Sequence, residues 1–295
     1  MYPFNHENAI KIIEQTHTVN EYVEYINANC INQAWIVMPD LEILRLCPTL
    51  KYLHISPSYN AKDSFDFSPL YEMKELKFLI CDNVYGDKEE YCAILDCSKR
   101  KDLEYLSVTY NKGILNLTEL INLKSLIVRK YKEKNLNNLF KSKILDTLEL
   151  TECSLHNLEG IEQSEKMQCL YLNYNRSLKD ISALKKIKNT LKALYIQKCP
   201  KIEDFQVLEE LENLETLVLL GNNKLPDLQF LKNLKKLKTF EFDYEVLDGV
   251  LDLCMSVDTV YCNRKYKHYN LSDKQLPKGE YVLGNENIDE WRRLE

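Results

Sequence analysis

The stretch LETLVLLGN, residues 214–222, decides the fold, because near-copies of it recur along most of the chain. The clearest copies follow the pattern LxxLxLxx(N/C): LEYLSVTYN at 103–111, LDTLELTEC at 145–153, MQCLYLNYN at 167–175 and LKALYIQKC at 191–199. Weaker copies begin at Ile31, Leu50, Leu76, Leu123, Leu237 and Val257. The eleven starts are separated by 19 to 27 residues, and spacings of 20 to 24 dominate. A recurring period of this length is the signature of a repeat architecture.

Each copy has the pattern of one strand followed by a short outer segment. The fourth and sixth positions are apolar and enclose an outward fifth position, which is the two-residue period of a strand with one buried face. Apolar residues then recur at every third position, as at Leu225, Leu228, Leu231 and Leu234, and this spacing suits short helical or 3₁₀ turns. Because each unit can bury its leucines only against its neighbours, the copies must stack into a parallel sheet. A doubly wound fold would need longer helices between the strands.

The motif resembles the leucine-rich-repeat family, and the match covers residues 31–265, more than three quarters of the chain. The resemblance implies an α/β solenoid with a parallel concave sheet and short helical or 3₁₀ segments on the convex side. It also implies that the last motif position points inward and satisfies backbone groups in the following bend. Five residues fit that position: Asn111, Cys153, Asn175, Cys199 and Asn222. The terminal copies and the stretch near Tyr131 depart from it and are expected to be irregular.

The ends of such a stack expose core residues and must be capped, which predicts three segments. Residues 1–30 are expected to form a helical N-terminal cap, with a helix or helical pair over residues 6–28. Residues 31–265 form the repeat solenoid, and extra residues at 56–67 and 82–98 predict loops at its rim. Residues 266–295 leave the pattern and are expected to form a C-terminal cap, with a tail that docks on a partner as the alternative. Five apolar anchors support the cap: Tyr281, Val282, Leu283, Ile288 and Trp291.

The net charge and the cysteines indicate which ligands and which cellular compartment to expect. The net charge of −6 argues against broad binding to nucleic acid or to an anionic membrane surface. No apolar run reaches the roughly 18 residues of a membrane-spanning helix, and the first residues lack the pattern of a secretory signal. The ten cysteines are scattered and contain no CxxC pair. Cys153 and Cys199 fit the inward motif position, and Cys81 and Cys262 fit the buried sixth, so these four are expected to be reduced thiols in a cytoplasmic protein.

The sequence shows little sign of catalytic chemistry. The five histidines are far apart, and none has the spacing of a metal site. His54, at an outward fifth position, lacks a neighbouring carboxylate or thiol in its register, and a general base needs a positioned partner. With seven glycines and no GxxxxGK[ST] or GxGxxG motif, a phosphate-binding loop is not predicted. We therefore expect no catalytic residue, no metal site and no cofactor.

The outward positions of the sheet are rich in aromatic residues. Aligning the copies places ten of them on the concave face: Trp35, Tyr52, Phe78, Tyr105, Tyr110, Tyr171, Tyr174, Tyr195, Tyr244 and Tyr261. Five acidic and four basic residues share that face, so it lacks the positive excess of a nucleic-acid groove. A balanced, aromatic surface is typical of protein-binding hot spots and predicts a protein or peptide partner. The alternative is that the tyrosines pack against one another as cross-strand pairs.

The resemblance points to a non-enzymatic binding module. The chain looks like a bacterial adaptor or an immunity-type protein that blocks a toxin, and it also resembles the repeat subunits that regulate phosphatases in eukaryotes. One alternative is a fragment of an effector enzyme, although about 30 residues on either side of the repeats are too few for a catalytic domain. A surface adhesin is another alternative, and it would require an N-terminal targeting segment. The oligomeric state and the identity of the partner are not predicted.

Overall fold

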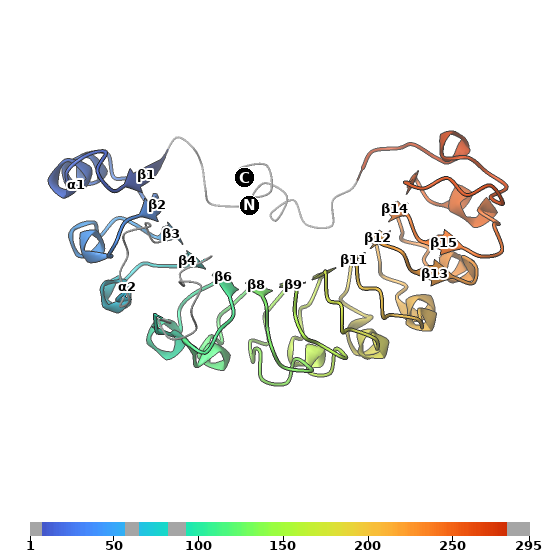
Figure 1. The fold of residues 1–295 in the computed structure, drawn as a ribbon, viewed down its shortest axis with the longest axis horizontal. Helices are drawn as coiled ribbons and strands as arrows, with labels where there is room; N and C mark the ends of the chain where they lie inside the picture. The colour runs from blue at the N-terminus through green and yellow to red at the C-terminus, as the bar shows by residue number, and fades with distance from the viewer. Residues whose placement is uncertain (1–7, 57–64, 82–92, 282–295) are drawn as a thin grey trace. The chain divides into compact units, whose positions relative to one another are not determined.

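The computed structural model describes residues 8–56, 65–81 and 93–281, which form parallel strands with short helical turns along one side (Figure 1). Within these residues twelve strands make one sheet in the order β1-β2-β3-β4-β6-β8-β9-β10-β11-β12-β14-β16. The chain divides into two compact units. Unit 1 comprises Met1–Val128 and Leu139–Ser142, and unit 2 comprises Arg129–Asn138 and Lys143–Glu295. The parts of the rim loops at 57–64 and 82–92 lie outside the described residues.

The first unit contains short strands that alternate with helical turns. Its described elements are β1 (Ala9–Ile13), α1 (Val19–Ala28), β2 (Gln33–Val37), η2 (Glu42–Leu46), β3 (Tyr52–Ile55), α2 (Ser68–Glu72), β4 (Phe78–Cys81), β5 (Leu95–Asp96), η4 (Cys97–Arg100), β6 (Tyr105–Thr109), β7 (Ile114–Leu115), η5 (Leu117–Glu119) and β8 (Ser125–Arg129), the last residue of which belongs to unit 2. The η segments are 3₁₀ helices.

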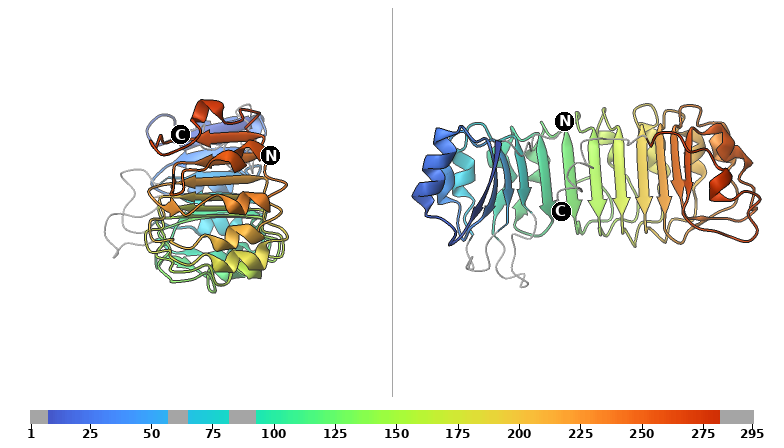
Figure 2. Two further views of the ribbon diagram at one scale, coloured as in Figure 1. Left: turned by 90° about the vertical axis from the view of Figure 1, so that its right-hand side faces the viewer. Right: turned by 90° about the horizontal axis from the view of Figure 1, so that it is seen from above.

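The second unit continues the same alternation. Its described elements are β9 (Thr147–Thr151), η6 (Ile161–Gln163), β10 (Cys169–Asn173), η7 (Ser182–Ile187), β11 (Ala193–Gln197), η8 (Gln206–Glu210), β12 (Thr216–Leu220), β13 (Lys224–Leu225), η9 (Gln229–Lys232), β14 (Thr239–Phe242), β15 (Glu245–Val246), η10 (Asp252–Ser256), β16 (Thr259–Cys262) and η11 (Asp273–Gln275). Seen from above, the strands of each unit lie side by side (Figure 2).

The strands begin where the repeated motif predicts them. Each of the eleven copies starts a strand of the main sheet two residues after its first position, as with Met167 before Cys169 in β10 and Leu214 before Thr216 in β12. The first, fourth and sixth positions point to the side that carries the turns, where Leu145, for example, is fully buried. The core of each repeat therefore lies between the sheet and its outer turn, and the predicted repeat fold is confirmed.

The inward position after the strand ties each repeat to the one before it. The Asn175 side chain is fully buried, accepts a hydrogen bond from Cys153 N at 2.8 Å and donates one to Leu150 O at 2.8 Å. Cys199 donates through Sγ to Leu172 O at 3.3 Å. These contacts supply partners to backbone groups that the bend leaves without sheet bonding.

Two of the five predicted inward residues are placed differently. Asn222 is exposed, and the next residue, Asn223, is the buried one, with Nδ2 donating to Cys199 O at 3.0 Å and Ile202 O at 2.8 Å. The reason is Gly221, whose φ of 151° lies in a region that other residues rarely adopt, so this repeat holds one extra residue before the inward position. Asn111 is only half-buried and forms its hydrogen bonds within its own loop, with Thr109 and Gly113.

Four successive repeats end in left-handed residues that themselves all belong to unit 2. Lys130, Glu152, Tyr174 and Lys198 occupy the eighth motif position, and their φ angles lie between 53° and 60°. The backbone N–H of each donates to the carbonyl of the seventh position in the next repeat, as in Tyr174 N to Gln197 O at 2.8 Å. Gly221 occupies the same position one repeat later. The left-handed turn therefore ends each strand while keeping its last N–H bonded to the neighbouring repeat.

The N-terminal segment differs in part from the expected helix or helical pair. Residues Ala9–Ile13 form β1, which pairs in parallel with β2 and extends the sheet by one strand. Three isoleucines in this segment favour extended backbone. The helix α1 follows, and its N-cap residue Thr18 forms a capping box with Glu21. The edge of the repeats is thus covered by a strand and a helix.

The described part of the C-terminal segment runs along the last strand. Val260 N donates to Pro277 O at 2.9 Å, and Gly279 N donates to Asp258 O at 3.1 Å. The Asp273 carboxylate accepts from Cys262 N at 2.9 Å. These contacts satisfy the backbone groups that an edge strand would otherwise present. Residues 282–295, with four of the five predicted anchors, lie outside the described residues.

Candidate functional site

The face of the sheet opposite the helical turns, here called the open face, carries the third, fifth and seventh motif positions. In unit 1 the third position forms an aromatic row, because Tyr52, Phe78 and Tyr105 are direct neighbours in the sheet register. Phe78 stacks on Tyr105 with ring centroids 3.9 Å apart. Phe78 and Tyr105 are buried, whereas Tyr52 is half-exposed. This row is therefore mainly a packed stack with one accessible ring.

The fifth position of unit 1 holds a second stack. Trp35 lies parallel to the His54 ring at a centroid distance of 5.0 Å, and Lys11 Nζ lies 3.8 Å from the indole centroid. The indole N–H donates to Ser56 Oγ at 3.3 Å, and His54 Nε2 lies 3.4 Å from the same oxygen. Ser56 Oγ therefore lies within hydrogen-bond distance of both rings of this stack.

In unit 2 the tyrosines at the fifth position pack against each other across neighbouring strands, as the alternative to an accessible surface predicted. Tyr171 and Tyr195 are direct neighbours in the register, and their rings stack 4.2 Å apart at an angle of 11°. Only 1% of Tyr171 and 9% of Tyr195 is exposed. Beside them Glu149 accepts hydrogen bonds from Asn173 Nδ2 at 3.1 Å and Thr151 Oγ1 at 3.2 Å. The prediction that all ten aromatic side chains form an accessible patch is thus too broad, because this pair lies within a packed layer.

The prediction that Tyr244 lies on the open face is wrong. Its side chain is fully buried and packs edge-on against Phe205 at 5.6 Å. Burial raises the pKa of its hydroxyl far above the ordinary range. The copy that starts at Leu237 turns inward one position early, so Tyr244 takes the place that Asn or Cys has in other repeats. Tyr110, Tyr174 and Tyr261 are half-exposed.

The C-terminal segment contributes to the open face at the end of unit 2. Tyr281 lies 5.7 Å from the Tyr261 ring, and Lys278 Nζ lies 4.5 Å from the same ring. Glu241 accepts hydrogen bonds from Tyr281 Oη at 2.8 Å and from Asn263 Nδ2 at 2.7 Å. Tyr261 is thus an anchoring point for the segment that follows the repeats.

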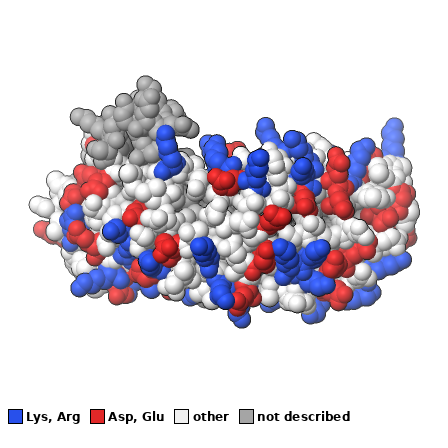
Figure 3. All heavy atoms as spheres, turned by 90° about the horizontal axis from the view of Figure 1, so that it is seen from below, with Lys and Arg blue, Asp and Glu red and all other residues white. Residues whose placement is uncertain are grey.

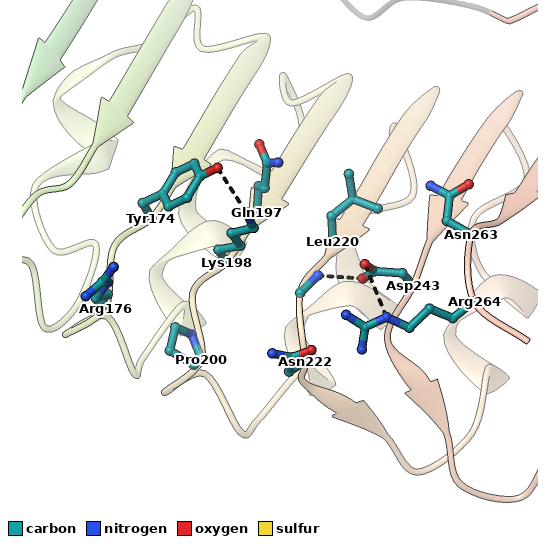
Figure 4. Close-up of a pocket in the computed structure, with 11 residues that line it drawn as sticks. Tyr174, Arg176, Gln197, Lys198, Pro200, Leu220, Asn222, Asp243, Asn263 and Arg264 are labelled. Atoms are coloured by element: carbon teal, nitrogen blue, oxygen red, sulfur yellow. Dashed lines mark hydrogen bonds and ion pairs between the residues drawn. The ribbon is translucent and has the colours of Figure 1, made fainter. Parts of the chain in front are cut away.

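A pocket of 460 Å³ lies at the carboxyl ends of five neighbouring strands, β10, β11, β12, β14 and β16, and is here called the rim pocket (Figure 4). Its lining comes from the residues at or just after each strand end: Tyr174, Arg176, Gln197, Lys198, Pro200, Leu220, Gly221, Asn222, Asp243, Asn263 and Arg264. The sequence analysis placed Tyr174 on this face among the aromatic residues but did not find the pocket. The available signal was the glycine at the eighth position, where the preceding repeats carry larger side chains.

The rim pocket has more cations than anions. Lys198 Nζ lies 3.1 Å from the Tyr174 hydroxyl and 4.8 Å from its ring centroid, which holds the ammonium group on this wall (Figure 4). Arg264 Nε lies 3.8 Å from Asp243 Oδ2, while Gly221 N donates to Asp243 Oδ1. A hydrogen bond with Tyr266 raises the pKa of Arg264, which therefore stays charged. Three cations and one carboxylate make the pocket positive on a chain of net charge −6.

The outer surface has a different charge pattern. Seen from below, lysine, arginine and acidic side chains are interspersed across it (Figure 3). Ion pairs join successive repeats there, as between Lys186 and Glu162 at 2.6 Å and between Lys188 and Glu210 at 3.0 Å. Exposed pairs of this kind contribute little to stability, typically about 0–1 kcal/mol each. In the described part of the chain we find no cluster of metal-ligating side chains and no helix able to span a membrane.

Comparisons with known proteins concern the fold. No protein-family model and no curated protein matches the sequence. An internalin (inlF) from Listeria monocytogenes is similar with a TM-score of 0.54 and 19% identity, over 79% of this chain and 66% of the internalin chain. A chain in the Toll–Spatzle complex of Drosophila is similar with a TM-score of 0.51 and 12% identity, over 86% of this chain and 36% of that chain. This chain thus spans less than two thirds of either structure. From its parallel strands, its repeated motif and these neighbours, we conclude that the chain has the leucine-rich-repeat fold.

Proposed function

We propose that this chain is a non-enzymatic module that binds a protein partner at the open face of its sheet, as a scaffold or as an inhibitor of the immunity type in the cytoplasm. The observation that carries the proposal is the rim pocket, which five successive repeats build from side chains that the core does not use. Repeat proteins bind partners through surfaces that several neighbouring repeats share. The similar Toll chain is described in complex with Spatzle, which agrees with a binding role for such surfaces.

The proposed contact residues are the accessible aromatic side chains of the open face. They are Trp35 and Tyr52 in unit 1 and Tyr174 and Tyr261 in unit 2. All four side chains are partly exposed and can therefore contact a partner. Large, stiff rings of this kind supply contact area at a low entropic cost. Phe78, which is buried, supports its neighbours by stacking.

The test begins with capture of a partner by the tagged chain from its native source, followed by calorimetry with the purified partner. Trp35→Ala and Tyr261→Ala should each weaken binding by about 2 kcal/mol or more, roughly 30-fold in Kd, which is the threshold of a hot spot. The matched control is Tyr25→Ala, because Tyr25 lies on α1 and is 54% exposed. Thermal unfolding of each free variant separates lost contacts from lost structure. Equal affinity of all three variants would show that the partner binds elsewhere.

A further inference from the structure

We propose that the rim pocket binds the carboxylate side chain of an acidic peptide segment, and this inference rests on the proposed protein-binding function. The pocket holds Arg176, Lys198 and Arg264 against a single carboxylate, Asp243. The hollow of 430 Å³ between the outer turns η7 and η8 is different, since four acidic residues and two lysines line it. The rim pocket thus has an excess of positive charge although the chain as a whole is acidic, and this excess suits an anionic ligand group.

The cations of the rim pocket retain donors for a ligand. Arg176 is exposed and forms no ion pair with any residue that the structure describes. Arg264 meets Asp243 through Nε at 3.8 Å, and a guanidinium group has five N–H donors, so others stay available. One oxygen of Asp243 is already bonded to Gly221 N, which leaves this carboxylate a weaker competitor for the arginine.

The backbone explains why a hollow exists between these side chains. Tyr174 and Lys198 occupy the eighth motif position in their repeats, and Gly221 occupies it in the next. Because the glycine has no side chain and Tyr244 of the next repeat is buried, the eighth-position side chains at the rim are interrupted between Lys198 and Arg264. A Cβ atom at Gly221 would lie 3.4 Å from Lys198 N, so the two repeats approach closely at the pocket floor.

The neutral lining favours a peptide over other anions. Gln197, Asn222 and Asn263 offer side-chain amides, which both donate and accept hydrogen bonds and so match the N–H and C=O groups of an extended peptide. The two guanidinium groups suit the planar geometry of a carboxylate. A nucleic acid would require a continuous basic track, and the negative net charge of the chain opposes a polyanion.

The experiment measures by calorimetry the binding of the peptide Gly-Ser-Glu-Glu-Ser-Gly, acetylated and amidated at its ends, to the full chain. Peptides with Gln-Gln or Lys-Lys at the centre are the controls, and inorganic phosphate is a competitor. The Glu-Glu peptide should bind at least about tenfold more tightly than the Gln-Gln peptide, a difference of about 1.4 kcal/mol. Added salt should weaken the binding, because the contact is ionic and accessible to solvent.

Variants locate the binding. Arg176→Gln with Arg264→Gln should reduce affinity for the Glu-Glu peptide at least about tenfold, or 1.4 kcal/mol. The charge-matched control, Lys232→Gln with Lys235→Gln, changes exposed lysines outside the pocket and should leave affinity within about twofold, or 0.4 kcal/mol. The single variant Arg176→Gln removes an exposed side chain and tests the site even if the double variant unfolds.

Three results would overturn the proposal. They are equal binding of the Glu-Glu and Gln-Gln peptides, equal loss in the pocket and control variants, and tighter binding of phosphate than of the Glu-Glu peptide. Absence of binding up to about 10 mM peptide would overturn it as well, because a built subsite should exceed that affinity. If the natural partner still binds and depends on Trp35 or Tyr261 in any of these cases, the protein-binding function stands and only the carboxylate subsite fails.

Discussion

Asn223 and Asn222 offer a direct test of the repeat register, because sequence and structure assign the inward position to different residues of this pair. The Asn223 side chain is 7% exposed and donates two hydrogen bonds, at 3.0 Å and 2.8 Å, to the carbonyls of Cys199 and Ile202 in the preceding repeat. Asn222 is exposed at the rim pocket. Replacing each residue by alanine should therefore have very different effects on stability.

The size of the effect follows from the groups that lose partners. Asn223→Ala leaves the Ile202 carbonyl without a donor among the described residues, whereas Cys199 O still accepts from Ile202 N at 3.3 Å. A buried group that loses its partner costs about 1–3 kcal/mol, and one further hydrogen bond contributes about 0.5–1.5 kcal/mol. Part of that loss is offset, because the Asn223 Oδ1 atom is itself buried without a hydrogen-bond partner and is removed by the substitution. We expect a net loss of about 1–3 kcal/mol for Asn223→Ala and a change within about 0.5 kcal/mol for Asn222→Ala.

Hydrogen exchange followed by mass spectrometry is the suitable assay, because a repeat protein of two units need not unfold in one step. Protection of peptides from β11 and β12 should fall in Asn223→Ala and stay unchanged in Asn222→Ala. Urea unfolding monitored by circular dichroism gives the shift of the unfolding midpoint in each variant. A loss for Asn222→Ala that equals or exceeds the loss for Asn223→Ala would refute the register and the role of Gly221 in setting it.

Three further predictions concern the backbone, the thiols and the ion pairs. Glu152→Gly should stabilise the protein by up to about 1 kcal/mol by relieving a left-handed φ, whereas Gly221→Ala should cost about 1–2 kcal/mol; opposite signs in urea unfolding would contradict this. Burial raises the pKa of Cys199 to about 11, so iodoacetamide at pH 8 should modify exposed Cys30 long before Cys199, and similar rates would contradict it. A hydrogen bond from Lys124 lowers the pKa of Glu104, so the stability that this pair contributes is present above the ordinary glutamate pKa of 4.5 and is lost as the pH falls below it. Glu104→Gln should flatten that acid limb by at most about 1 kcal/mol after screening by salt, and identical limbs would disprove it.

The strands were predictable because the motif encodes them locally. An apolar residue at the first, fourth and sixth positions indicates both the strand and its buried face, and every copy from Ile31 to Val257 begins a strand two residues after its first position. β1 was missed because AIKII has no motif copy and its pairing with β2 depends on an edge that only the assembled sheet provides. The segment boundaries at residues 30 and 265 remain predictions.

The candidate site was less predictable, because position on a face does not determine exposure. The motif placed Tyr171 and Tyr195 outward, and both do lie on the open face, but rings 4.2 Å apart shield one another. Tyr244 was misplaced because its repeat turns inward one residue early, a shift that the spacing of leucines does not reveal. The rim pocket depends on backbone geometry at Gly221 and on side chains from five repeats, and no single copy of the motif contains that information.

The backbone bonds that link the eighth position of one repeat to the seventh of the next have a consequence for how such a chain can evolve. Both partners in Tyr174 N to Gln197 O are main-chain atoms, and the same is true at Lys130, Glu152 and Lys198. The bond itself uses no side-chain atom, and lysine, glutamate and tyrosine all stand at the eighth position in its left-handed conformation. Substitutions among residues that tolerate the left-handed conformation can therefore accumulate along this rim, and a repeat gained or lost by recombination would keep the same backbone bonds to its neighbours.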